Sequence, residues 1–265
     1  QPGGESLLFA KKSVLTRIER EQRTFAQTKD FDLGVRMRLG FAYLGLERWR
    51  EAALVLEDAL TLPGDPKQQA QAGLAVIQCW HELKRYDRAI ANADAWLARF
   101  EQAAGEDATA RARFLLAQAL YDDQQFIEAA AIFDELHARH TTHDLAPEAL
   151  LMAGLSFLMA DDIEPALARL VRLQMDHAKL PLPEDASYWQ GMAHSFDQQH
   201  EKCRDHLAAH LKRFAKSARY QAAAEFRRAY CRFMLADYEG AVEEFDAYLR
   251  DHSQGADAGE AGVLK

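Results

Sequence analysis

Residues 37–60, MRLGFAYLGLERWREAALVLEDAL, determine the fold that the rest of the chain adopts. The stretch reads as two short helices joined by a tight turn. On the second helix, apolar residues recur at helical spacing and form one stripe, made of Ala52, Leu56, Ala59 and Leu60. Neither helix can bury its apolar face alone, so the pair needs neighbouring copies of itself.

The pattern centred on Ala52 recurs six times along the chain. Its small anchor residues stand 37 to 40 positions apart, and they are Ala52, Ala89, Ala129, Ala166, Cys203 and Ala241. Three positions earlier stand the residues expected to close the turn, which are Trp49, Tyr86, Phe126, Ile163, His200 and Tyr238. Because protein interiors are densely packed, a close helix crossing accepts only small anchors.

Two further positions keep the same spacing. Twelve residues before the anchors stand Gly40, Ile77, Ala117, Gly154, Gly191 and Ala229. Four residues after the anchors stand Leu56, Ala93, Phe133, Leu170, Leu207 and Phe245. The second repeat, with Ile77, and the fifth, with His200, fit the pattern least well. Chance spacing in an alanine-rich chain does not explain six matches at four positions.

These residues resemble the tetratricopeptide repeat (TPR) family, whose unit is about 34 residues long. The resemblance covers residues 33–250, and the extra residues of each repeat fall between its second helix and the next first helix. The linkers 139–149 and 213–218 are similar to those of bacterial envelope TPR proteins. Examples are the Tol–Pal-associated periplasmic protein and the lipoprotein subunit of the outer-membrane barrel assembly machinery. The resemblance implies a periplasmic or cell-envelope location, with the cytoplasm as the alternative.

The expected architecture is all-α: a right-handed superhelical solenoid of about six TPR-like hairpins plus an N-terminal helix. Residues 1–32 are predicted to hold the capping helix, with apolar positions that include Leu15 and Ile18. Residues 33–251 are predicted to form the solenoid, with hairpins at 33–61, 68–101, 108–140, 146–177, 184–214 and 219–251. Residues 252–265 are interpreted as the start of a further repeat or a tail. Asp185 is expected to cap the N-terminus of a helix.

Composition narrows the classes of partner. Apolar residues make up 49% of the chain, which is enough for a continuous core. The net charge of −9 argues against bulk nucleic-acid affinity, because phosphate binding needs a basic face. No apolar run approaches the ~18 residues that a membrane span needs. Acidic residues dominate 121–164 and basic residues dominate 201–232, an asymmetry that either orients a partner or reflects two solvated helix faces.

The three cysteines, Cys79, Cys203 and Cys231, all fall on predicted helices. An odd count without close spacing predicts neither a disulfide framework nor a zinc site. We therefore expect buried, reduced thiols that act as small apolar side chains. This pattern fits a reducing compartment and is compatible with the periplasm.

The sequence offers little for catalysis. Two histidine sets have spacings that can chelate a metal: His137, His140 and His143, and the pair His206 and His210. Neither set has an HExxH pattern or a nearby cysteine pair, so packed or surface histidines are the favoured interpretation. Two pairs of aspartates, at 122–123 and 161–162, fall at predicted turns, and aspartate is a common residue in turns. The sequence therefore predicts no catalytic residue, no metal and no cofactor, and a metal-dependent enzyme is the alternative.

The resemblance also implies that the first helix of each hairpin lines the concave face. Carrying the inward-facing positions of the family over gives a mostly apolar lining, which in the first two repeats consists of Met37, Phe41, Leu44, Leu74, Gln78 and His81. The residues expected to contact a ligand are Phe114, Tyr121, Leu155, Tyr188, Met192, Phe226, Tyr230 and Phe233. The Lys/Asn/Arg clamp of chaperone-binding TPR domains is absent, because repeat one carries Met37 and Phe41 there. The alternative is that these side chains pack between adjacent repeats.

The function predicted from these features is a non-catalytic protein–protein interaction scaffold. It binds a peptide or protein segment in the concave groove, and a basic segment with Arg227, Arg228 and Arg232 is expected to steer an acidic ligand. The alternative is a structural spacer or self-assembling module of a larger envelope protein, which would make the chain a homo-oligomer.

Overall fold

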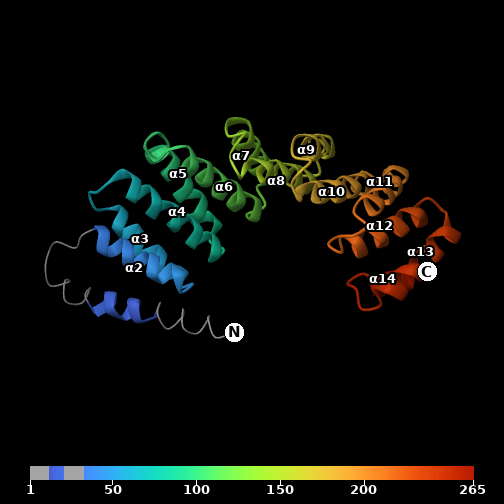
Figure 1. Cartoon of the computed structure of the whole chain (residues 1–265), viewed down its shortest axis with the longest axis horizontal. Helices are drawn as coiled ribbons and strands as arrows, with labels where there is room; N and C mark the ends of the chain where they lie inside the picture. Colours follow the sequence, from blue (N-terminus) through green and yellow to red (C-terminus); the bar gives the residue numbers. More distant parts are fainter. Residues whose placement is uncertain (1–11, 21–32) are drawn as a thin grey trace. The chain divides into compact units, whose positions relative to one another are not determined.

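The structure is a computed structural model that describes residues 12–20 and 33–265. All regular secondary structure in these two ranges is helical (Figure 1). The chain divides into two compact units, Gln1–Leu145 and Ala146–Lys265. Each unit contains three of the six predicted hairpins. The all-α fold of TPR-like hairpins is thus confirmed.

The helix bounds follow the predicted hairpins closely. Unit 1 contains α2 (Leu33–Gly45), α3 (Trp49–Leu60), α4 (Pro66–Glu82), α5 (Tyr86–Ala104), α6 (Glu106–Asp122) and α7 (Phe126–Arg139). Unit 2 contains α8 (Ala146–Met159), α9 (Ile163–Asp176), α10 (Leu182–Phe196), α11 (His200–Arg213), α12 (Gln221–Met234), α13 (Tyr238–Asp251) and the short α14 (Ala258–Leu264). Pro66 starts α4 because a proline fits at the first helical position, where no partner for its nitrogen is needed.

The six hairpin turns share one backbone geometry. Every second helix begins on the residue predicted to close the turn, from Trp49 in α3 to Tyr238 in α13. Two positions earlier, a non-glycine residue has a left-handed backbone with φ between 55° and 64°; these are Glu47, Lys84, Gln124, Asp161, Gln198 and Ala236. The next N–H then reaches back into the first helix, as from Arg48 to the Tyr43 carbonyl at 3.0 Å. This is a Schellman-type ending, which usually places glycine at the left-handed position.

Ala236→Gly is expected to raise the free energy of unfolding by about 1 kcal/mol. The left-handed conformation costs a residue with a Cβ roughly 1–2 kcal/mol, and glycine avoids that cost at the expense of a more flexible unfolded chain. The matched control is Ala208→Gly inside α11, which should lose about 1 kcal/mol. Urea denaturation followed by circular dichroism measures both. A loss of equal size in the two variants would show that the turn carries no strain.

In the core of each hairpin, two positions carry side chains that complement each other in size. A Cβ added to Gly40 would meet the Leu56 Cγ at 2.4 Å, and one added to Gly191 would meet the Leu207 side chain at 2.3 Å. The second repeat reverses the sizes, with Ile77 at the glycine position and Ala93 at the leucine position, and both side chains are fully buried. The misfit of Ile77 to the sequence pattern therefore has a compensating partner.

Within each unit the first helices of the hairpins form one continuous layer. In unit 1, α4 contacts both α2 and α6, and in unit 2, α10 contacts both α8 and α12. No comparably extensive contact joins one second helix to another in the described ranges. The first helices of a unit therefore lie closer to one another than its second helices do. The surface that they share, on the side away from the second helices, is hereafter called the first-helix face of that unit.

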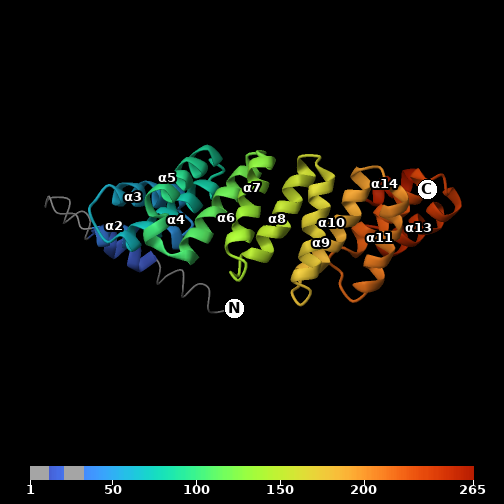
Figure 2. The same ribbon diagram turned by 90° about the horizontal axis from the view of Figure 1, so that it is seen from above.

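A helical segment at residues 12–20 of unit 1 packs against the first hairpin. It lies beside α2 in both views (Figures 1 and 2), with Leu15 and Ile18 buried. The Tyr43 hydroxyl of α2 donates a hydrogen bond to Glu19 at 2.7 Å. Burial, followed by this bond, raises the pKa of Tyr43 to about 12. The rest of the predicted capping helix lies outside the described residues.

Candidate functional site

The first-helix face of unit 1 contains a hollow of about 360 Å³. Its walls come from three neighbouring first helices, and its lining residues are Phe41, Leu44, Gln71, Leu74, Ala75, Gln78, Arg111 and Leu115. Four of these, Phe41, Leu44, Leu74 and Gln78, occupy positions that the TPR resemblance assigns to the concave face. The hollow thus lies among positions that the resemblance assigns to the concave face, whereas the residues chosen as ligand contacts lie further along the chain.

The hollow combines an apolar floor with polar groups at its edge. Phe41, Leu74 and Leu115 are half-buried, while the amides of Gln71 and Gln78 are exposed one above the other on α4. Arg111 holds an ion pair with Asp107 at 3.0 Å, one turn earlier on α6. The floor can accommodate apolar side chains of a ligand, and the glutamine amides can both donate hydrogen bonds to a peptide backbone and accept hydrogen bonds from it.

Four of the eight predicted contact residues are buried in the core. Phe114 packs edge-on against Phe133 at 5.5 Å, and Phe226 packs against both Phe245 and Tyr248. Tyr188 is stacked on Tyr220, with ring centroids 4.3 Å apart, and Met192 belongs to the same cluster. These side chains hold hairpins together, as the packing alternative proposed. Their burial gives a ligand little direct access.

The other four predicted residues remain partly accessible. Tyr121 in unit 1 is half-buried against Phe126, and burial raises the pKa of its hydroxyl. In unit 2, Leu155, Tyr230 and Phe233 are half-buried on α8 and α12. Sequence reasoning could not separate the two groups, because positions one helical turn apart look alike until the rotation of each helix is known.

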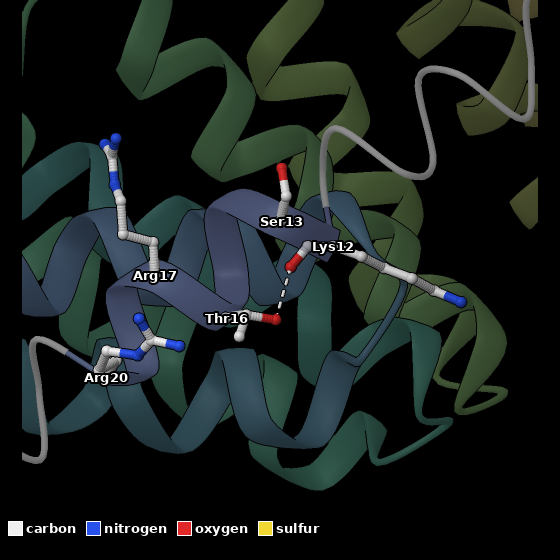
Figure 3. A pocket seen from close by; sticks show the side chains of 5 residues that line it. All are labelled: Lys12, Ser13, Thr16, Arg17 and Arg20. Carbon is white, nitrogen blue, oxygen red and sulfur yellow. Dashed lines mark hydrogen bonds between the residues drawn. The ribbon is translucent and has the colours of Figure 1, made fainter.

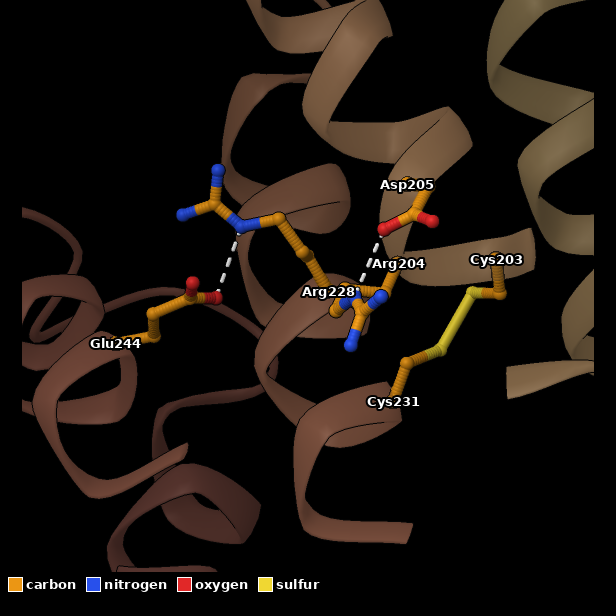
Figure 4. The surroundings of a disulfide bond; sticks show 6 residues. All are labelled: Cys203, Arg204, Asp205, Arg228, Cys231 and Glu244. Carbon is orange, nitrogen blue, oxygen red and sulfur yellow. Dashed lines mark hydrogen bonds and ion pairs between the residues drawn. A yellow bond between two sulfur atoms is a disulfide. The ribbon is translucent and has the colours of Figure 1, made fainter. Parts of the chain in front are cut away.

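The basic segment of α12 differs from its prediction. Glu244 on α13 accepts hydrogen bonds from Arg228 and Arg232, each at 2.8 Å, and Arg232 also pairs with Asp237 (Figure 4 shows the Arg228–Glu244 pair). These two guanidinium groups tie α12 to α13 and are neutralised there. Arg227 instead lies over the Tyr230 ring, 5.3 Å from its centroid.

The histidines singled out for metal binding have structural partners. His140 and His143 contact Glu106 and Asp107 on α6, at 3.0 and 3.2 Å, and so fasten the end of α7 to α6. His206 contacts the Ser187 carbonyl at 3.0 Å. Burial lowers the pKa of both His206 and His210, which favours their neutral forms. In the described ranges, no group of three or more His, Cys, Asp or Glu side chains is arranged so that it could hold a metal ion.

The expectation of three reduced cysteines is wrong. Cys203 in α11 and Cys231 in α12 form a disulfide between the fifth and sixth repeats (Figure 4). Cys203 stands at the anchor position that is alanine elsewhere, and the two residues are 28 positions apart in sequence. The sequence did not reveal this pair, because the stacking of successive repeats, and not a short spacing in the chain, brings the two helices together. Cys79 is a buried free thiol, and burial raises its pKa to about 12.

We expect the purified protein to carry one free thiol. Alkylation of the denatured, unreduced chain should modify Cys79 alone, and prior reduction should expose Cys203 and Cys231 as well. Intact mass spectrometry with peptide mapping measures both states. Three alkylated cysteines before reduction would contradict the disulfide.

A buried carboxylate joins the linker before α12 to α10. Asp185 is 2% exposed, and it accepts hydrogen bonds from Arg219 at 2.9 Å and from the Tyr220 hydroxyl at 2.6 Å. Burial, and then the bond to Asp185, raise the pKa of Tyr220. The predicted capping role of Asp185 is wrong, because α10 begins earlier, at Leu182. Its role is to lock the fifth and sixth repeats.

A second hollow, of about 420 Å³, lies against the 12–20 segment (Figure 3). It is lined by Lys12, Ser13, Thr16, Arg17 and Arg20, with the Thr16 hydroxyl bonded to the Lys12 carbonyl at 3.0 Å. All five residues belong to one helical stretch whose flanking residues are outside the described ranges. We assign it no role.

Sequence comparisons find no matching family model and no matching curated protein. Solved structures do match. The C-terminal part of a TPR repeat-containing protein from Cytophaga hutchinsonii aligns with a TM-score of 0.70 and 13% identity, over 96% of this chain and 98% of that one. PilW, a widely conserved type IV pilus biogenesis factor, aligns at 0.62 and 19% identity, over 88% and 98%. YrrB, described as a TPR protein with an unusual peptide-binding site, aligns at 0.54 and 16% identity, over 73% and 92%.

The helices of the described ranges include none long and apolar enough to cross a bilayer. At these identities the structural matches establish the fold alone. Six hairpins, the shared left-handed turn and the small anchor residues all agree with it. The chain therefore has the tetratricopeptide-repeat fold.

Proposed function

We propose that this protein is a non-catalytic protein–protein interaction scaffold that binds an extended peptide segment of a partner on its first helices. The observation that carries the proposal is the unit 1 hollow, where an apolar floor lies between exposed glutamine amides. Such a surface suits alternating side chains and main-chain groups of a peptide. The similarity to YrrB, whose description includes a peptide-binding site, supports the same mode.

In this proposal the predicted residues divide by accessibility. Tyr121, Leu155, Tyr230 and Phe233 are candidate ligand contacts, each on the first-helix face of its own unit. Phe114, Tyr188, Met192 and Phe226 support those contacts from the core. Aromatic side chains suit ligand contacts because they bury much area at small entropic cost.

Leu74→Arg is expected to weaken binding of a selected peptide about tenfold or more, because a charge would replace apolar area at the centre of the hollow. Peptides are first selected from a random display library on the immobilised protein, and their affinities are measured by fluorescence anisotropy. The matched control is Leu54→Arg on α3, where the leucine is 50% exposed and away from the first-helix face. It should leave the affinity unchanged.

Circular dichroism has to show that both variants remain folded. Equal affinity of Leu74→Arg and the parent protein would exclude the hollow as the peptide site. Loss of binding in Leu54→Arg alone would move the site to the second helices.

We further propose a periplasmic or cell-envelope location. The Cys203–Cys231 disulfide supports it, because such bonds persist in oxidising compartments. The structural similarity to PilW, a pilus biogenesis factor, points the same way.

A further inference from the structure

Three neighbouring helices of unit 2 each end on an exposed apolar side chain. The last residues of α8, α10 and α12 are Met159, Phe196 and Met234. They are 39%, 41% and 46% exposed, respectively. Each stands seven positions before its repeat anchor, so the three side chains occupy equivalent places on helices that contact one another. We call this row the apolar ledge.

The ledge is confined to unit 2. At the same position, the helices of unit 1 end on Gly45, Glu82 and Asp122. The repeat therefore does not need an apolar residue there for folding. An exposed apolar row that the fold does not require is a candidate interaction surface. Methionine and phenylalanine adapt their shape to a bound partner and are typical of surfaces that accept an apolar helix face.

The hairpin turns beside the ledge carry negative charge. The turns that follow the three helices contain Asp161, Asp162, Asp197 and Asp237, and no lysine or arginine. Arg232 pairs with Asp237, which leaves the other three carboxylates on the rim.

We infer that the apolar ledge is a second docking surface, for an amphipathic partner segment whose apolar face is bordered by lysine or arginine. The apolar side chains of such a segment cover Met159, Phe196 and Met234. Its cations meet the acidic rim. This ligand differs from that of the unit 1 hollow, whose edge carries amides and one arginine.

The probe for this inference is a short amphipathic helical peptide with leucine on one face and lysine on the other. A second peptide carries glutamate in place of lysine. The protein is labelled with ¹³C at its methionine methyl groups, and methyl NMR spectra are recorded at physiological ionic strength. The lysine peptide should shift Met159 and Met234. Met175, which is 76% exposed on α9, and Met37 in unit 1 serve as internal controls.

Affinity measurements complete the test. The triple variant Met159→Gln/Phe196→Gln/Met234→Gln should bind the lysine peptide about tenfold more weakly or worse. The matched control Val171→Gln/Met175→Gln replaces exposed apolar residues of α9 and should bind like the parent. Leu74→Arg should also bind like the parent, which separates this surface from the unit 1 hollow. The three single variants replace the triple variant if it fails to fold.

Four results would overturn the inference. The first is no binding of the lysine peptide by the parent protein. The second is equal binding of the glutamate and lysine peptides. The third is undiminished binding by the ledge variants. The fourth is a concentration-dependent shift of Met159 and Met234 without peptide, which would assign the ledge to a second copy of the chain.

Discussion

Replacing Leu56 with alanine is expected to lower the free energy of unfolding by about 2–5 kcal/mol, and adding Gly40→Ile should restore much of that loss. The Leu56 side chain is fully buried and fills the space that the missing Cβ of Gly40 leaves. Its truncation creates a cavity in a densely packed hairpin. Ile77 and Ala93 show that the fold accepts the reversed combination in the neighbouring repeat.

The single variant Gly40→Ile completes the double-mutant cycle with Leu56→Ala. It should be strongly destabilising on its own, because the added side chain would overlap with Leu56. Denaturation followed by tryptophan fluorescence weights unit 1, since three of the four tryptophans, Trp49, Trp80 and Trp96, lie there. Additive effects of the two substitutions would contradict the pairing of sizes.

Arg219→Met is expected to cost about 3 kcal/mol, because it leaves the buried Asp185 carboxylate with only the Tyr220 hydroxyl as a partner. The double variant Asp185→Asn/Arg219→Met should recover part of the loss. A neutral amide can still accept the Tyr220 hydrogen bond, and no buried charge remains.

The control is Arg172→Met, which removes an exposed ion pair with Asp176 on α9. Such surface pairs contribute less than about 1 kcal/mol, so its denaturation midpoint should hardly move. Equal effects of Arg172→Met and Arg219→Met would show that the Asp185 cluster does not lock the fifth and sixth repeats.

Most of the fold could be predicted from the repeat spacing. Six small anchors, from Ala52 to Ala241, predicted six hairpins, and the turn residues three positions earlier begin every second helix. This success has a physical cause: the tight crossing and the turn impose local demands on residue size, and those demands recur wherever the hairpin does. Ile77 looked like an exception only because its partner, Ala93, was not considered together with it.

The site was harder to predict from sequence. Phe114 and Leu115 are adjacent in the chain, yet Phe114 is core and Leu115 lines the hollow. A rotation of the helix by one residue decides between them, and apolar residue type does not encode that rotation. Contacts between distant segments, such as Cys203–Cys231 and Asp185–Arg219, likewise depend on how successive repeats stack.

The most direct test of the proposed scaffold function is a crystal structure of the protein with a peptide selected for binding. Our account predicts peptide density across the first helices of unit 1, with apolar side chains against Phe41, Leu74 and Leu115 and main-chain hydrogen bonds to Gln71 or Gln78. Peptide density on the second helices, near Leu54, with the hollow unchanged would contradict it.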